Sequence, residues 1–161
     1  MTEKKLMIRA YVPEEELYRD FFELATQSFA HGSPWTLRQY ADTLADTQLK
    51  FFVAETEDTI IGYAGGKVLL DEAEIYSVAV APDFKNRQLA TQLVRTFIEY
   101  CKSQGVEVMY LEVRQSNVPA RNFYKKLGFK EVGKRPEYYR HPIEDAVLMK
   151  CTIGKLEHYE Q

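Results

Sequence analysis

Apolar and polar residues alternate weakly in the first part of the chain and then change to a helical spacing. Residues 5–12 show the alternation, which predicts a β-strand. Pro13 and the three glutamates that follow it place negative charge where a helix dipole is positive, so we expect a helix from Pro13 to Ser28. The residues 31–34, His-Gly-Ser-Pro, interrupt this spacing, and a second short helix is expected over residues 35–44.

The middle of the chain is predicted to form a hairpin, a strand and a helix. Residues 49–55 and 59–70 are rich in β-branched and aromatic residues, and a polar Thr-Glu-Asp turn separates them. Residues 73–80 predict another strand, which ends at an Ala-Pro-Asp sequence. Apolar side chains on one helical face then predict a helix over residues 89–104.

The last third of the chain predicts one buried strand, a short helix and a strand pair. Residues 106–113 are almost continuously apolar, which is typical of a strand buried on both faces. A helix over residues 118–127 is expected to end at Gly128, which tolerates a left-handed backbone. Residues 130–139 and 145–153 predict two final strands.

These elements predict an α/β fold with a mixed sheet. Strands and helices alternate only in the middle of the chain, whereas both ends supply hairpins, so helices are expected on both faces of the sheet. We expect one domain over residues 1–161, with 154–161 as a frayed tail. Open α/β sheets bind ligands at the carboxyl ends of their strands, which directs attention to the residues after Val80 and Val113.

Composition excludes several classes of protein. Of the 161 residues, 45% are hydrophobic and 28% charged, as in folded globular domains, and the formal net charge is −3. A negative chain is a poor candidate for binding nucleic-acid phosphates, so no direct nucleic-acid contact is expected. An early arginine, Arg9, breaks the first apolar stretch, and no apolar run reaches membrane-spanning length. We therefore expect a cytoplasmic protein with no membrane partner.

The cysteines and histidines predict neither a disulfide framework nor a metal site. Cys101 and Cys151 have no CxxC spacing and are interpreted as buried free thiols. The three histidines share no metal-ligand spacing: His31, His141 and His158.

The segment after Val80 has the character of an anion site. Lys85 and Arg87 lie just before the predicted helix, whose first N–H groups and positive dipole end attract negative charge. Basic side chains at a positive helix end oppose the dipole, and an anion between them would relieve this conflict. The segment therefore favours phosphate binding, with a solvated basic loop as the alternative.

At this segment the sequence resembles the GCN5-related N-acetyltransferases, or GNAT enzymes. Their acetyl-CoA fingerprint is read here as Lys85, Asn86, Arg87, Gln88, Leu89 and Ala90. Gln88 stands where that family usually has glycine, so close approach of the backbone to a pyrophosphate depends on the backbone angles at Gln88. The resemblance implies a central, mostly antiparallel twisted sheet with helices on both faces.

The resemblance extends from about Pro34 to Met149 and is strongest to the bacterial enzymes that acetylate the N-terminal alanine of ribosomal protein S18. The matching stretches are Ser33-Pro34-Trp35, Leu70 to Ala73, Leu111 to Arg114, Ser116-Asn117, Phe123-Tyr124, Leu127 to Phe129, Tyr138-Tyr139 and Glu144 to Ala146. It implies direct acetyl transfer from acetyl-CoA to a protein N-terminal α-amine, through a ternary complex, with no metal.

Two residues are candidates for catalysis. Glu112 is a carboxylate near the end of a buried apolar run, where ionised groups are rarely tolerated without purpose. The resemblance implies that Glu112 is the general base, whereas the plainer interpretation is an ion pair with Arg114 or a neighbouring cation. It also implies that Tyr124 is the general acid that protonates the CoA thiolate, although a tyrosine at this helical position is also typical of a core.

The resemblance also assigns residues to the two substrates. It assigns acetyl-CoA binding to the backbone of Val78, Ala79 and Val80 and to Lys85, Asn86, Arg87, Gln88, Leu89, Ala90, Thr91 and Asn117. Asn117 is also a candidate for a helix N-cap. Trp35, Tyr138 and Tyr139 are the candidates for acceptor binding, since aromatic side chains give large contact areas with a polar tip. Core packing explains at least one of these three equally well.

Two other functions stay open at this point. The acceptor amine is a lysine side chain, a polyamine or another small amine in the first alternative. In the second, the chain is an acyl-CoA-binding module without turnover, and Gln88 in place of glycine is the feature that supports it.

Overall fold

The structure, a computed structural model, describes residues 5–154, with the side chains of Asn86 and Arg87 excepted. Most of the predicted frayed tail, 154–161, lies outside these residues. The described elements are β1 (Leu6–Ala10), η1 (Pro13–Glu15), α1 (Tyr18–Ser28), α2 (Leu37–Ala45), β2 (Leu49–Thr56), β3 (Thr59–Leu69), β4 (Glu72–Val80), η2 (Pro82–Arg87), α3 (Leu89–Ser103), β5 (Val108–Arg114), α4 (Val118–Lys126), β6 (Lys130–Arg140) and β7 (Ile143–Thr152).

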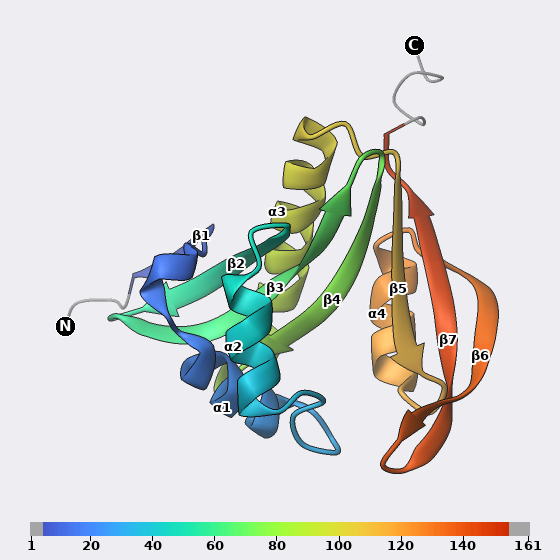
Figure 1. Cartoon of the computed structure of the whole chain (residues 1–161), viewed down its shortest axis with the longest axis horizontal. Coiled ribbons are helices and arrows are strands. Elements are labelled where there is room, and N and C mark those ends of the chain that lie inside the picture. Colours follow the sequence, from blue (N-terminus) through green and yellow to red (C-terminus); the bar gives the residue numbers. More distant parts are fainter. Residues whose placement is uncertain (1–4, 155–161) are drawn as a thin grey trace. The chain divides into compact units, whose positions relative to one another are not determined.

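The seven described strands hydrogen-bond in the order β1-β2-β3-β4-β5-β7-β6. Figure 1 labels each strand. The pairs β1–β2, β2–β3, β5–β7 and β6–β7 are antiparallel, and β4–β5 is parallel. This mixed, mostly antiparallel sheet confirms the predicted fold class. The contacts divide the chain into two compact units, residues 5–67 with Tyr76–Tyr100 and Val68–Ile75 with 101–154. A single domain stays a prediction.

The first unit has helices on both faces of its strands. On one face α1 and α2 cover a core in which the ring of Phe21 stacks on Tyr63, with centroids 4.4 Å apart. On the other face Phe52 meets Tyr100 of α3 at 5.8 Å. Figure 1 shows α1 and α2 in front of these strands and α3 behind them. Because successive side chains of a strand point to opposite faces, β2 and β3 contribute apolar side chains to a layer on each face.

The predicted helix from Pro13 is wrong at its start. Pro13–Glu15 forms only a 3₁₀ turn, and Glu16 then takes a left-handed backbone with φ 54°. An α-helix cannot continue through such a residue, so α1 begins at Tyr18. The other predicted elements are present, with ends displaced by one or two residues.

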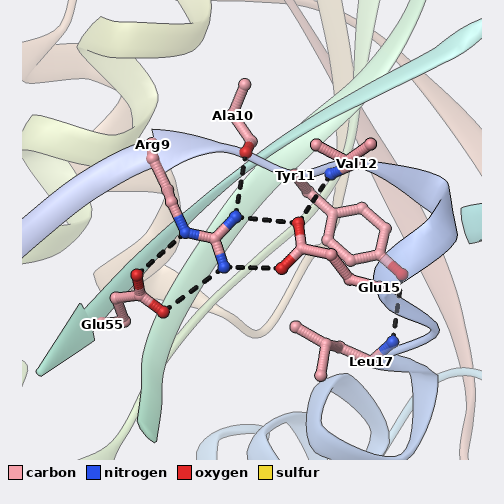
Figure 2. Close-up of polar contacts among 7 residues, drawn as sticks. All are labelled: Arg9, Ala10, Tyr11, Val12, Glu15, Leu17 and Glu55. Atoms are coloured by element: carbon pink, nitrogen blue, oxygen red, sulfur yellow. Dashed lines mark hydrogen bonds and ion pairs between the residues drawn. The ribbon is translucent and has the colours of Figure 1, made fainter. Parts of the chain in front are cut away.

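Arg9 ties this irregular start to the sheet, as Figure 2 shows. Its guanidinium donates to both carboxylate oxygens of Glu15, at 2.6 and 2.8 Å, and to those of Glu55 on β2, at 2.9 and 3.3 Å. Glu15 also accepts from the backbone N–H of Val12 at 2.9 Å. The phenol oxygen of Tyr11 accepts from the N–H of Leu17 at 3.0 Å. These contacts fix the turn before α1.

In the second unit, β5 has one buried face and one partly open face. Met109, Leu111 and Val113 are buried, but Tyr110 and Glu112 on the opposite face are only half-buried. The prediction of burial on both faces is therefore wrong in degree. The strand is mostly apolar in composition, but every second residue, including Tyr110 and Glu112, lies on a face that is only half-buried. The helix α4 ends before Gly128, whose φ of 102° confirms the predicted left-handed stop.

Replacing Arg9 by glutamine is expected to lower the free energy of unfolding by about 2 kcal/mol at pH 7, since hydrogen bonds between charged groups are lost. Arg9 holds the pKa of Glu15 below its ordinary value of 4.5. The folded state therefore gains stability above about pH 4.5 and loses it as the pH falls through the lowered pKa.

Urea unfolding of wild type and Arg9→Gln at pH 7 and pH 3.5 checks this expectation. The difference in unfolding free energy should shrink at the lower pH. Arg38→Gln, at an exposed position of α2, is the control and should change stability by less than about 0.5 kcal/mol. An equal effect of the two substitutions would contradict the role of the Arg9 cluster.

Candidate active site

The parallel pairing of β4 with β5 is short. It joins Glu72 to Val108, Ala73 to Met109 and Glu74 to Tyr110, whereas β4 continues to Val80. Residues 75–80 of β4 therefore lie beyond the last pair with β5.

The predicted donor-binding residues Val78, Ala79 and Val80 form the last part of β4, in the first unit. Ala79 and Val80 are buried, so their side chains belong to the core and their contribution to a ligand is limited to the backbone. The carbonyl of Val80 accepts a hydrogen bond from Ser28 Oγ at 2.7 Å, which fixes the end of the strand.

The segment between β4 and α3 is a 3₁₀ helix, η2, where the sequence predicted a loop. Gln88 follows it with a left-handed backbone, φ 56° and ψ 21°. This is the conformation for which glycine has the lowest cost, and here a glutamine adopts it. Lys85 Nζ donates to the carbonyl of Ser28 at 3.2 Å, at the end of α1.

The first turn of α3 offers backbone donors. Leu89 is buried, whereas Ala90 and Thr91 are half-buried, and the N–H of Gln92 donates to the Gln88 carbonyl at 3.1 Å. A helix cannot pair the N–H groups of its first turn internally, and its dipole is positive there. Residues 88–91 therefore fit a pyrophosphate group.

Trp35 lies in the loop before α2. Ser33 Oγ accepts from the N–H of Trp35 at 3.3 Å and donates to its carbonyl at 2.6 Å. The indole contacts Tyr40 of α2, with centroids 4.9 Å apart, and Tyr76 of β4, at 6.4 Å. The Trp35 side chain is only half-buried, so it is partly a core residue and partly accessible from outside the core.

In the second unit, Glu112 points to the open face of β5 and pairs with Arg135 of β6. Its side chain is 14% exposed, and Oε2 lies 3.0 Å from Arg135 Nε. This oxygen is buried, and within residues 5–154 the contact lacks the alignment of a hydrogen bond. The plainer interpretation, an ion pair of Glu112 with Arg114 or a neighbouring cation, is confirmed in its second form, since the partner is Arg135. Its first form is wrong, because Arg114 pairs with Glu144 at 3.2 Å.

An irregularity in β6 sets the positions of Tyr138 and Tyr139. Arg135 is registered with Ala146 and Tyr139 with Glu144, so residues 136–138 bulge opposite Asp145. Bulges re-aim the side chains that follow them. The two tyrosine rings meet edge to face at 5.1 Å.

Glu112 acts electrostatically on both tyrosines. Burial and the negative charge of Glu112 raise the pKa of Tyr139 to about 12. Burial raises the pKa of Tyr138 as well, and Glu112 and Glu74 add to this effect. Both phenols are therefore neutral hydrogen-bonding groups at pH 7, within the electrostatic reach of the Glu112 carboxylate.

Arg114 supports this cluster, and the sequence did not reveal its role. Its guanidinium lies 4.5 Å from the centroid of the Tyr139 ring. It donates to the carbonyls of Pro142 at 2.9 Å and His141 at 3.3 Å. Glu144 in turn accepts from the N–H of Ser116. Arg114 thereby fixes the β6–β7 turn and the ring of Tyr139.

The helix α4 carries Tyr124 and begins at Asn117. Asn117 Oδ1 accepts from the N–H of Ala120 at 3.2 Å, which confirms its N-cap role. Tyr124 is 8% exposed and contacts the rings of Phe123 and Phe129 at 5.0 and 5.6 Å. Burial raises the pKa of Tyr124 above its usual range, so this phenol keeps its proton at neutral pH.

Comparison with known proteins identifies the family. Residues 14–129 match the acetyltransferase (GNAT) family. The chain belongs to the GNAT family. A ribosomal protein bS18-alanine N-acetyltransferase of Salmonella typhimurium is 34% identical over 127 residues, which are 78% of this chain and 85% of the relative.

Two solved GNAT structures show the same fold. The ribosomal-protein-S18-alanine N-acetyltransferase from Escherichia coli has a TM-score of 0.82 and 26% identity, covering 93% of this chain and 95% of that one. Ard1 from Thermoplasma volcanium has a TM-score of 0.80 and 25% identity, covering 92% and 97%. The chain is thus an N-acetyltransferase with acetyl-CoA as donor, as its resemblance implied.

Two further findings concern metals and membranes. Among residues 5–154, no three His, Cys, Asp or Glu side chains gather in a way that would hold a metal ion. No helix in that range combines the length and apolar character needed to span a bilayer.

The backbone at Gln88 gives a direct test of the fingerprint. Gln88→Gly is expected to stabilise the enzyme by up to about 1 kcal/mol, because a left-handed backbone costs less at glycine. The matched control is Gln92→Gly, one turn later on the exposed side of α3, which should destabilise by about 1 kcal/mol. Thermal unfolding measures both variants, and equal destabilisation would show that Gln88 is not left-handed.

Proposed function

We propose that this GNAT enzyme acetylates the α-amine at a protein N-terminus, and that the acceptor is the N-terminal alanine of ribosomal protein S18. The relatives named for this reaction support the proposal, since one is 34% identical over most of both chains. The observation that carries it in the structure is the cluster around Glu112, where a carboxylate lies among neutral phenols on the open face of β5.

The chemistry of an N-terminal amine suits this cluster. The acceptor must lose a proton before its nitrogen lone pair attacks the thioester. An α-amine has a pKa of about 7.7–8.0, against about 10.4 for lysine, so much more of it is neutral at pH 7. A single carboxylate, partly neutralised by Arg135, is a sufficient base for such an amine.

In the proposed reaction, Glu112 takes the ammonium proton through Oε1, directly or through water, because Oε2 faces Arg135. The amine nitrogen then bonds to the acetyl carbonyl carbon, and the carbon–sulfur bond breaks. The thiolate leaves with the electron pair and is stabilised by the Tyr124 O–H. Tyr124 gives its proton to the thiolate, and the attacking nitrogen, positively charged after the bond forms, loses a second proton that restores Tyr124. The proton on Glu112 passes to solvent. The products are the acetylated amine, protonated CoA and one released proton.

Direct transfer needs no acyl-enzyme. Both cysteines are buried, and burial raises the pKa of Cys101 to about 12 and that of Cys151 above its usual value. Thiols in this state are poor nucleophiles. Neither cysteine therefore has a place in the proposed reaction.

For acetyl-CoA we propose three contacts. The backbone of Val78–Val80 bonds the pantetheine arm and the acetyl carbonyl, and residues 85–91 bind the pyrophosphate, with Lys85 leaving the Ser28 carbonyl for the phosphate. The exposed amide of Asn117 bonds CoA with the donor group that the helix cap leaves unused.

For the acceptor we propose contacts with Trp35, Tyr138 and Tyr139. Trp35 and Tyr138 are partly exposed aromatic groups, and the neutral phenols suit a peptide backbone, which offers both donors and acceptors. A ribosomal acceptor places the enzyme in the cytoplasm, with no need for nucleic-acid or membrane contacts.

The catalytic roles are tested with a peptide that carries the S18 N-terminal sequence. Glu112→Gln and Tyr124→Phe are each expected to lower kcat by about 10²-fold or more, because each removes one proton-handling group. Mass spectrometry locates the acetyl group, and acetyl-CoA binding is measured in parallel. Cys101→Ala is the control and should retain turnover. Normal turnover in both variants would refute the assigned roles.

The class of acceptor is tested by competition between amines. An alanine-terminated peptide should be acetylated at its α-amine much faster than a lysine peptide with a blocked N-terminus, and faster than a polyamine. Preferential modification of lysine or polyamine would overturn the proposed acceptor. Binding of acetyl-CoA without transfer to any amine would support a non-catalytic module instead.

A further inference from the structure

Three hydroxyl groups form a chain inside the first unit. Tyr40 OH lies 2.8 Å from Tyr63 OH, which lies 2.8 Å from Ser77 Oγ. Both tyrosines are fully buried, and Ser77 is 6% exposed. The chain of hydroxyls joins three elements: α2, β3 and β4.

These three hydrogen-bonded hydroxyls connect two parts of the first unit to which the proposed reaction assigns a role. At one end, the ring of Tyr40 contacts the ring of Trp35, the proposed acceptor contact, with centroids 4.9 Å apart. At the other end, Ser77 is the residue before Val78, where the proposed donor-binding backbone of β4 begins. Trp35 also contacts Tyr76, the neighbour of Ser77, at 6.4 Å.

Packing alone does not require these hydroxyls. Phe21 and Phe51 surround the ring of Tyr63, with centroids at 4.4 and 6.1 Å, so a phenylalanine would fit the same apolar cluster. A buried hydroxyl is costly unless it is hydrogen-bonded, and the bonds that satisfy it fix the distance between its partners. A small movement of β4 at Ser77 must therefore be followed by Tyr63 and Tyr40 or break a buried bond.

We propose that Tyr40, Tyr63 and Ser77 are positioning residues that couple the donor strand β4 to the Trp35 loop, so that CoA binding on β4 alters the acceptor contact at Trp35. This coupling rests on the proposed function for the roles of β4 and Trp35. It is reciprocal, so an acceptor that fixes Trp35 also strengthens CoA binding.

The single tryptophan makes the coupling measurable, because Trp35 alone supplies indole fluorescence. CoA, which cannot react, is titrated into wild type, Tyr63→Phe and Ser77→Ala while Trp35 emission is recorded. Binding of CoA is measured separately by calorimetry. The matched control is Tyr11→Phe, which removes the hydroxyl of another buried tyrosine in the same unit, where it accepts from the N–H of Leu17.

We expect CoA to change Trp35 emission in wild type and Tyr11→Phe but not in Tyr63→Phe or Ser77→Ala, although all four bind CoA. The KM for the acceptor peptide should rise about 5-fold or more in Tyr63→Phe with little change in kcat. Thermal unfolding should show similar losses for Tyr63→Phe and Tyr11→Phe. An emission change in Tyr63→Phe equal to that of Tyr11→Phe would overturn the coupling.

The two proposals fail in different ways. If wild type does not acetylate an N-terminal amine, the proposed acceptor is wrong, and the emission response to CoA still decides the coupling. If wild type acetylates the peptide and Tyr63→Phe matches Tyr11→Phe in emission and KM, the coupling is wrong and the proposed function stands.

Discussion

Parallel pairing between β4 and β5 ends at Glu74 and Tyr110, although both strands continue, and this early end determines what the rest of each strand can do. Beyond it, β4 extends to Val80, and β5 extends to Glu112 and Arg114. A longer ladder would use the backbone groups of these residues within the sheet. The proposed donor contacts and the proposed base both belong to the part of each strand that follows the last pair.

The regular elements were predictable because their signals are local. Apolar spacing within ten or so residues sufficed for every strand and for α2, α3 and α4, with small errors at the ends. The start of α1 was not predictable in this way, because Arg9 draws Glu15 toward Glu55 of β2, and the turn then passes through a left-handed Glu16. Contacts between distant residues override the favourable charge pattern that Pro13 and its glutamates present.

The same distinction applies to the site. Glu112 was visible in the sequence as a carboxylate in an apolar run, but Arg135 was not, because their contact depends on the β5-β7-β6 order and on the register of β6. The alternative partner, Arg114, is two residues from Glu112 in sequence, yet it turns to Glu144 and the β6–β7 turn. At Gln88 the sequence shows only a departure from glycine, whereas the structure gives this glutamine the left-handed backbone that glycine adopts most readily.

Charge at the Glu112 cluster also bears on which amine the enzyme would accept. An isolated carboxylate in a partly buried site would hold the ammonium form of any amine, since opposite charges attract strongly there. Arg135, 3.0 Å from Glu112, offsets much of that attraction, and the neighbouring phenols of Tyr138 and Tyr139 are uncharged at pH 7. Such a cluster gives little advantage to a lysine or polyamine, which is almost fully protonated at pH 7. It suits an amine that is already partly neutral, as an N-terminal α-amine is near pH 7.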